Sequence, residues 1–207
     1  LAAGTYADVF WVWPGNGNVG AGDVVAPEGY LADLSDQEWV SQVPAAINQV
    51  AEIDGTTYAL MLETTSYGAM YNDNALAETG LSIPETWSEL LQFCADARAA
   101  GKIPFSLGLA TPFESQNFTY TMTPQLVQGD NPGLDFDDLM KAGEITFGES
   151  GWTETYEKSV ELVNAGCFND DFMGIDYVEA NRLWGVGDAV GRFGIGVYMK
   201  MIEGETD

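Results

Sequence analysis

A short polar segment between two strand-like runs constrains the fold of this chain more than any other feature. Tyr58–Leu62 and Tyr67–Tyr71 are short, mostly apolar runs that read as strands, and the polar segment Glu63–Ser66 joins them. Neither an Asn-Gly nor a Gly-Asn turn separates the two runs, so a tight hairpin is not expected. The pattern predicts that the chain crosses here from one sheet to another. Such a crossing is typical of the hinge in a two-lobed protein with a ligand cleft between its lobes.

Strand-like and helix-like segments alternate along the sequence. Strands are expected at Tyr6–Trp13, Phe105–Leu109 and Gly194–Met201, and Asp54-Gly55 is expected to form a turn between two short strands. Helices are expected from Ser35 onward and from Thr86 to Gly101, and over Pro44–Ala51, Asn74–Thr79, Phe118–Gly129, Thr153–Asn164 and Asp176–Val186. This alternation predicts an α/β fold with largely parallel strands.

Local signals support two of these helices. Thr86 and Glu89 have the spacing of a capping box, in which each residue satisfies a backbone N–H group of the other. In a later helix, Tyr156, Val160 and Val163 recur at helical spacing. That spacing predicts that these three side chains face the interior.

The chain is strongly acidic, with 32 acidic and 7 basic residues, and no basic residue precedes Arg98. Such a charge repels nucleic acid and anionic membrane surfaces. The excess of acidic residues is explained by a solvated acidic surface that keeps a secreted protein soluble. Adaptation to salt and a Ca²⁺ site are the alternative explanations. The acidic residues lack the D-x-[DN]-x-[DN]-G spacing of a calcium loop.

Several classes of catalytic site are excluded by composition. The sequence has no histidine, which removes the usual general base, the Ser-His-Asp triad and most zinc sites. Gly15–Gly20 matches G-x-G-x-x-G, but Pro14 and the paired Asn residues suit an irregular polar loop better than a dinucleotide site. No cofactor and no metal ion are expected. No run of 18 apolar residues occurs, so no membrane span is expected either.

An ordered set of segments resembles a known protein family. In chain order the segments are Asp8–Trp11, Leu31–Leu34, Asp54–Leu60, Tyr71–Asn72, Pro84–Leu91, Ala100–Phe105 and Gly187–Val190. Together they resemble the extracellular solute-binding proteins of bacterial ABC importers, in the group that binds sugars and oligosaccharides. The similarity departs after Val190, where Gly191–Tyr198 stands in place of the family's Met, Gly and Trp.

The resemblance implies a two-lobed α/β fold of the periplasmic-binding-protein type. Residues 1–62 would be part of lobe one, 63–66 the hinge crossing and 67–207 part of lobe two, with both lobes incomplete because family members are longer. The implied protein is an extracellular monomer, anchored to a bacterial membrane as a lipoprotein. It would close its lobes on a sugar and deliver the sugar to an ABC permease.

The resemblance implies binding without catalysis, and two other functions remain open. One is a cell-surface glycan-binding module of the lectin type. The other is a glycoside hydrolase, which needs two carboxylates on opposite sides of the sugar; Glu63 and Glu114 are the candidates.

A sugar site needs aromatic platforms for the apolar faces of the rings and polar side chains for the hydroxyls. In a regular strand Trp11 and Trp13 share a face, and the alternative is that both lie in the core. The resemblance implies ligand contacts in three places: the loop after this strand, the crossing, and the segment after a strand of lobe two. At the crossing, Glu63 could instead cap backbone N–H groups. The candidate ligand-binding residues are Trp13, Asn16, Asn18, Glu63, Tyr67, Phe113, Glu114, Gln116 and Trp152.

The two cysteines, Cys94 and Cys167, each lie in or after a helical pattern. They could pair in an exported chain, or they could be two buried free thiols. The resemblance to exported proteins favours a disulfide between them within lobe two.

Overall fold

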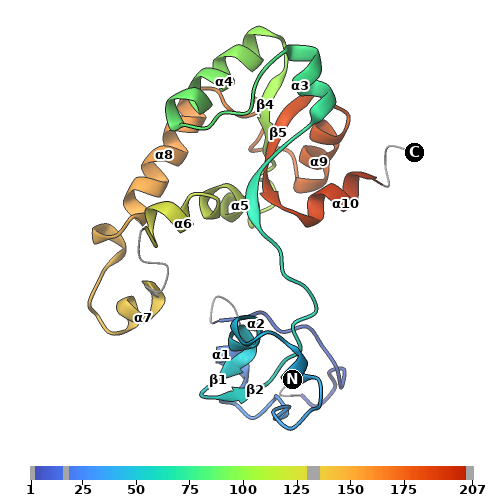
Figure 1. Cartoon of the computed structure of the whole chain (residues 1–207), viewed down its shortest axis with the longest axis vertical. Helices are drawn as coiled ribbons and strands as arrows, with labels where there is room; N and C mark the ends of the chain where they lie inside the picture. Colours follow the sequence, from blue (N-terminus) through green and yellow to red (C-terminus); the bar gives the residue numbers. More distant parts are fainter. Residues whose placement is uncertain (1–2, 16–18, 130–135, 204–207) are drawn as a thin grey trace. The chain divides into compact units, whose positions relative to one another are not determined.

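A computed structural model describes residues 3–15, 19–129 and 136–203 of the chain. The chain divides into two compact units, residues 1–64 (unit 1) and 65–207 (unit 2), with the boundary between Thr64 and Thr65. Each unit is described by itself below (Figure 1).

Unit 1 consists of short elements joined by irregular chain. They are α1 (Gly22–Val25), η1 (Val40–Gln42), α2 (Ala45–Asn48), η2 (Gln49–Ala51), β1 (Glu52–Ile53) and β2 (Thr56–Thr57). β1 and β2 pair antiparallel around Asp54 and Gly55, which have φ values of 51° and 77°. Two positive φ angles in a two-residue loop are the requirement of the hairpin turn that Asp-Gly favours. The predicted turn is therefore confirmed.

The strand predicted at Tyr6–Trp13 does not form. Trp13 makes a single bridge with Ala21, and Val9 is 91% exposed. A strand is stabilised by neighbouring backbone and by burial of a face, and the described part of unit 1 supplies neither along this segment. Tyr58–Leu62 is likewise extended without strand pairing.

The helix predicted from Ser35 is also absent, because the Ser35 side chain has another partner. Its hydroxyl accepts the backbone N–H of Thr57 at 3.1 Å, and its own N–H donates to the Asp33 carboxylate at 2.9 Å. The hydroxyl therefore fastens this segment to β2 and does not cap a helix. The helix predicted at Pro44–Ala51 is present as α2 followed by η2.

Unit 2 is built on a sheet of three strands, β3 (Tyr67–Tyr71), β4 (Ile103–Ser106) and β5 (Ala189–Ile195). β5 lies in the middle, antiparallel to β3 and parallel to β4, so the prediction of largely parallel strands was wrong for the described sheets. The remaining elements of unit 2 are α3 (Asp73–Thr79), α4 (Trp87–Ala99), α5 (Glu114–Tyr120), α6 (Thr123–Leu126), α7 (Phe136–Lys141), η3 (Phe147–Glu149), α8 (Trp152–Asn164), α9 (Tyr177–Gly185) and α10 (Val197–Glu203) (Figure 1).

The predicted capping of α4 is confirmed. The Thr86 hydroxyl accepts the N–H of Glu89 at 3.3 Å, and the Glu89 carboxylate accepts the N–H of Thr86 at 3.1 Å. α3 begins in the same manner, since the Asn72 side chain accepts the N–H of Ala75, and it ends at Gly80 in the left-handed conformation. Both ends of α3 therefore follow the helix signals of the sequence.

The C-terminal strand lies earlier in the chain than predicted. Gly194–Met201 was expected to be a strand, but β5 ends at Ile195 and α10 occupies Val197–Glu203. Glycine suits the paired part of β5 because a Cβ at Gly191 would lie 2.6 Å from the Phe105 ring.

Helix α8 forms where it was predicted, but it buries a different face from the predicted one. Tyr156, Val160 and Val163 are exposed, while Thr155 and Ser159 are buried together with Leu162. Small polar side chains can be buried here because their hydroxyls donate to carbonyl groups of the same helix, Thr155 to Gly151 and Ser159 to Thr155. The predicted inward face was therefore wrong. The helix predicted at Phe118–Gly129 is also divided, between α5 and α6.

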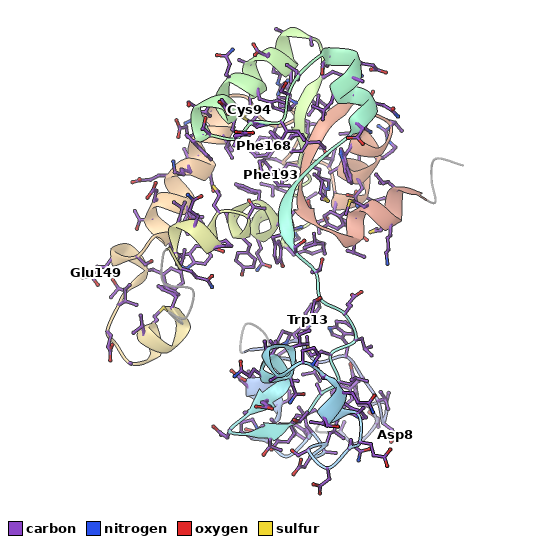
Figure 2. All side chains as sticks on the ribbon, in the orientation of Figure 1. Asp8, Trp13, Cys94, Glu149, Phe168 and Phe193 are labelled. Atoms are coloured by element: carbon purple, nitrogen blue, oxygen red, sulfur yellow. A yellow bond between two sulfur atoms is a disulfide. The ribbon has the colours of Figure 1, made fainter. Side chains whose placement is uncertain are left out.

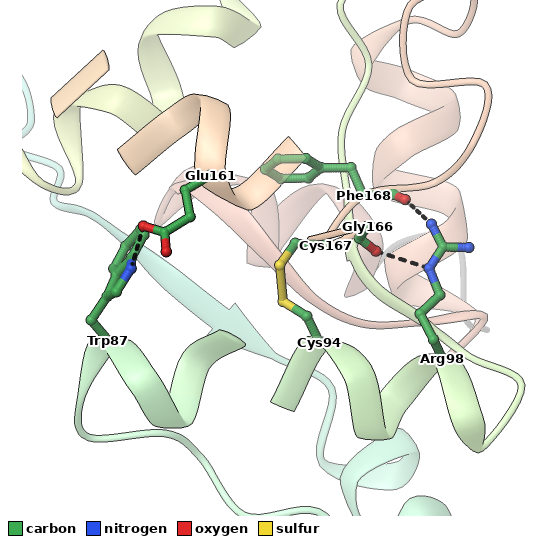
Figure 3. The surroundings of a disulfide bond; sticks show 7 residues. All are labelled: Trp87, Cys94, Arg98, Glu161, Gly166, Cys167 and Phe168. Carbon is green, nitrogen blue, oxygen red and sulfur yellow. Dashed lines mark hydrogen bonds between the residues drawn. A yellow bond between two sulfur atoms is a disulfide. The ribbon is translucent and has the colours of Figure 1, made fainter. Parts of the chain in front are cut away.

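The core of unit 2 surrounds a disulfide between Cys94 of α4 and Cys167, with Cα atoms 5.0 Å apart. The predicted pairing is confirmed. Figure 3 shows two further connections across the same interface: Arg98 donates to the carbonyl oxygens of Gly166 and Phe168, and Trp87 donates to Glu161.

The segment that follows the disulfide runs beside β4. The N–H of Phe105 donates to the carbonyl of Cys167 at 2.9 Å, and Phe105 forms a bridge with Phe168. The Phe168 ring lies 6.2 Å from the Phe193 ring within the core of unit 2 (Figure 2). The disulfide therefore fixes a segment that extends the hydrogen bonding of the sheet.

Among the described residues, no helix combines the length and the apolar character that crossing a membrane requires.

Candidate functional site

A row of aromatic side chains lies on unit 2, and we call it the aromatic row. It begins at Tyr67, the first residue of β3, which meets Tyr120 at the end of α5 with ring centroids 5.4 Å apart. Tyr120 meets Trp152, the first residue of α8, at 6.0 Å. Trp152 in turn contacts Phe147 of η3 and Tyr156 of α8, each at 5.8 Å. Tyr67, Phe147 and Tyr156 are exposed, so the row reaches solvent at several points.

The aromatic row also carries polar groups. Burial raises the pKa of Tyr67, and the neighbouring Tyr120 raises it further by a smaller amount. The Tyr67 hydroxyl is therefore protonated at neutral pH and can both donate and accept hydrogen bonds. The Trp152 indole N–H is buried and has no hydrogen-bond partner among the described residues. Such a set offers ring faces for stacking and hydroxyls for hydrogen bonds.

Phe113 and Gln116 lie at the N-terminal end of α5, and both are exposed. The Phe113 ring lies 5.5 Å from that of Tyr177, the first residue of α9. Phe113 and Gln116 therefore remain accessible to a ligand within unit 2.

Glu114, between these two residues, has a different environment. It is fully buried, and its carboxylate accepts from Arg192 of β5 at 2.7 Å, from the Tyr198 hydroxyl of α10 at 2.6 Å and from Asn117 at 2.8 Å. Arg192 is fully buried as well, and its guanidinium lies 4.7 Å from the centre of the Tyr198 ring. Since both Glu114 oxygens are occupied inside the protein, the expected ligand contact is replaced by an internal role.

The Tyr198 hydroxyl stays protonated in this surrounding. Burial, and then the hydrogen bond to Glu114, raises the pKa of Tyr198 far above that of a free tyrosine. Glu114, Asn117, Arg192 and Tyr198 form what we call the buried cluster.

In unit 1, Trp13 is 54% exposed and meets the exposed Trp11 edge-on, with ring centroids 5.7 Å apart. Neither indole lies in a core. Trp13, Asp23 and Tyr58 border a pocket of only about 20 Å³, which has room for a single water molecule. This pocket is therefore too small for a sugar ring, and the exposed part of the Trp13 indole is available for stacking.

Of the other predicted site residues of unit 1, the structure describes one and leaves two undescribed. Glu63 is exposed, in an extended segment with no helix or strand. Asn16 and Asn18 lie outside the described residues. Of the predicted site residues, the structure joins Tyr67 and Trp152, through the ring of Tyr120.

Sequence reasoning missed Tyr120, Phe147 and Tyr156. One signal was available, because Trp152 and Tyr156 are four residues apart and so share a helix face. Tyr120 and Phe147 join the row only through tertiary packing. No group of His, Cys, Asp or Glu side chains in the described part of the chain is arranged to hold a metal ion.

Comparison with known proteins places these features in a family. The profile of the bacterial extracellular solute-binding proteins matches residues 1–179. The multiple sugar-binding protein of Streptococcus mutans is 23% identical over 107 residues, which cover 52% of this chain and 25% of that protein.

Solved structures show the same fold. A chitin oligosaccharide binding protein matches with a TM-score of 0.72 and 20% identity over 82% of this chain and 42% of its own. A sugar transporter of Bacillus licheniformis, solved in complex with stachyose, matches with a TM-score of 0.64 and 20% identity over 82% of this chain and 44% of its own. This chain thus spans less than half the length of either structure, and the predicted α/β fold of solute-binding proteins is confirmed. The chain belongs to the bacterial extracellular solute-binding proteins.

Proposed function

We propose that this chain is part of an extracellular protein that binds a sugar or oligosaccharide and delivers it to the permease of an ABC importer. The aromatic row is the observation that carries the proposal. The row starts at the exposed ring of Tyr67, three residues past the boundary of unit 1, and continues through the half-buried rings of Tyr120 and Trp152. Linked rings with hydroxyls at their edges match the alternation of apolar faces and hydroxyl rims in a carbohydrate.

The relatives support the same class of ligand. One is a chitin oligosaccharide binding protein, and another was solved with stachyose. Both ligands are chains of uncharged, hydroxyl-bearing sugar rings, which suits a site of aromatic and hydrogen-bonding side chains without clustered basic groups.

Several residues are proposed to complete the site. From unit 2 these are Tyr67 and Trp152 in the aromatic row, with Phe113 and Gln116 at the start of α5. From unit 1 they are Trp13, Glu63, Asn16 and Asn18. Residues 1–62 and 67–207 are proposed as parts of the two lobes, and Glu63–Ser66 as the hinge that closes them on the ligand.

The proposed protein is a monomer anchored to the outer face of a bacterial membrane as a lipoprotein. The exposure of Phe113 and Gln116 and the burial of Glu114 favour binding over hydrolysis, because a glycosidase needs two carboxylates that reach the sugar. A lectin-like surface module would bind sugars too, but would not bind a permease.

A ligand screen tests the proposal. The full-length protein is heated alone and with stachyose, chitin oligosaccharides, amino acids or short peptides, because a ligand that binds only the native state raises the melting temperature. A rise with one or more sugars, and no release of smaller sugars after prolonged incubation, is the expected result. A rise with amino acids or peptides alone, or turnover of a sugar, would contradict the proposal.

A further inference from the structure

The buried cluster links α5 to three other parts of unit 2. Glu114 and Asn117 lie one turn apart on α5, Arg192 comes from β5 and Tyr198 from α10. Arg192 also donates to the carbonyl of Ser106 in β4 at 3.3 Å, and Asn117 donates to the Tyr198 hydroxyl at 2.7 Å. Each member of the cluster is more than nine-tenths buried.

We propose that the buried cluster is a positioning device: it fixes the rotation and the axial position of α5, and thereby places Phe113 and Tyr120 for ligand binding. The inference rests on the proposed sugar-binding function. Phe113 immediately precedes α5 and Tyr120 is its last residue, so any movement of the helix displaces both rings.

Helix α5 depends on the rest of unit 2 to hold it in place. It spans seven residues, which is too short to be stable by itself, and no side chain caps its N-terminus. Its Ser115 and Gln116 side chains face solvent. The anchoring therefore comes from its inner face, where Phe118 packs on Phe168 with ring centroids 5.5 Å apart and Glu114 and Asn117 join the buried cluster.

The chemistry of the cluster is suited to fixing an orientation. A charge-assisted hydrogen bond between carboxylate and guanidinium is strong only over a narrow range of distance and angle. The two carboxylate oxygens of Glu114 accept hydrogen bonds from two different elements. Arg192 of β5 donates to one oxygen, and the Tyr198 hydroxyl of α10 donates to the other. An apolar contact of the same size would allow the helix to slide or turn, whereas this arrangement defines one orientation.

The rings at both ends of α5 depend on that orientation. Tyr120 meets Tyr67 and Trp152 edge-on, and such contacts change with small rotations of the ring. At the other end, Phe113 contacts Tyr177, whose ring stacks at 6.4 Å on that of Tyr198. The cluster thus reaches Phe113 through packed rings as well as through the helix.

The first test needs no ligand. Glu114→Gln keeps the shape of the side chain and removes its charge, and Tyr198→Phe removes only the hydroxyl while keeping the ring over Arg192. Val190→Ala is the control, since Val190 is a fully buried core residue of the same strand as Arg192 and is apolar. Tyr120→Leu identifies the part of the near-ultraviolet circular dichroism that comes from the ring contacts of Tyr120.

In the two cluster variants, amide hydrogens of α5 should exchange about tenfold faster or more than in the control, at a temperature well below melting. The same variants should lose part of the dichroism band identified by Tyr120→Leu, and the control should keep it. Equal exchange in α5 and an unchanged band in both cluster variants would overturn the positioning role. If Glu114→Gln fails to fold, Tyr198→Phe alone decides the outcome.

The second test measures binding of the sugar that gives the largest thermal shift, with stachyose measured first. The cluster variants should bind it about tenfold more weakly than Val190→Ala, although none of the changed atoms reaches solvent. Affinity equal to that of the control would contradict the inference. If the unmodified protein binds no sugar, the proposed function fails, while the exchange and dichroism results still decide whether the cluster positions α5.

Discussion

The Glu114 carboxylate and the Arg192 guanidinium meet at 2.7 Å, and neither side chain has any exposure to solvent. A second pair on the same unit, Glu179 and Arg182, meets at 2.6 Å with side chains 41% and 45% exposed. The two pairs have nearly the same length and differ in burial. Comparing the two pairs therefore shows how burial changes the contribution of an ion pair to stability.

Removing the cation should have very different consequences at the two places. Arg192→Met should lower the free energy of unfolding by about 3–5 kcal/mol, because it leaves the Glu114 charge buried without compensation. Arg182→Met should lower it by about 1 kcal/mol or less, because water and salt screen the exposed pair. Urea unfolding measures both values. Similar losses for the two variants would show that the Glu114–Arg192 pair is not as buried as the structure has it.

The disulfide should be a major source of stability. Cys94 and Cys167 are 73 residues apart, and a bridge over a loop of that length restricts the unfolded chain by about 4 kcal/mol in the chain-entropy model. Cys94→Ser combined with Cys167→Ser should therefore lower the free energy of unfolding by an amount of that order. Reductant should destabilise the unmodified protein and leave the double variant unaffected. If reductant affected both equally, the effect would have another source.

Alkaline pH should destabilise unit 2 through a buried tyrosine. Burial between aromatic rings raises the pKa of Tyr71 from 10.0 to about 12. The folded state therefore holds this proton more tightly than the unfolded chain, and the stability that follows is complete below about pH 10 and lost as the pH rises toward 12.

Urea unfolding at intervals from about pH 8 to about pH 11.5 measures this loss. Tyr71→Phe should flatten the fall in stability, because the phenyl ring has no proton to lose. Tyr30→Phe, in unit 1, is the control and should follow the unmodified protein. An equally steep fall in Tyr71→Phe would assign the alkaline instability to other groups, among them Tyr198.

Local signals predicted features of both units. The capping box of α4 and the Asp54-Gly55 turn both depend on residues close together in sequence, and both formed as predicted. Such signals describe the backbone of one segment. They carry no information on which face of a helix meets the rest of the protein.

The predictions that failed concern features that depend on tertiary packing. Helix α8 buries Thr155 and Ser159 because their hydroxyls are satisfied within the helix, and hydrophobic spacing alone pointed to the opposite face. The strand at Tyr6–Trp13 has the right residues but lacks neighbouring strands in the described chain. Burial of Glu114 depends on Arg192, which is 78 residues away, and no local pattern links the two.

Sugar binding by the aromatic row is the central claim, and two tryptophans allow a matched test. Trp152 and Trp87 are each the first residue of a helix of 13 residues in unit 2, but only Trp152 belongs to the aromatic row. Each is replaced by leucine in the full-length protein, and calorimetry measures the affinity for the sugar that gives the largest thermal shift.

Trp152→Leu should weaken binding by about 2 kcal/mol, close to thirtyfold, as expected for an aromatic anchor. Trp87→Leu should bind as the unmodified protein does, because the Trp87 indole is engaged with Glu161 and Lys158. Unchanged affinity in Trp152→Leu, or equal losses in the two variants, would contradict the assignment of the aromatic row as the sugar-binding surface of unit 2.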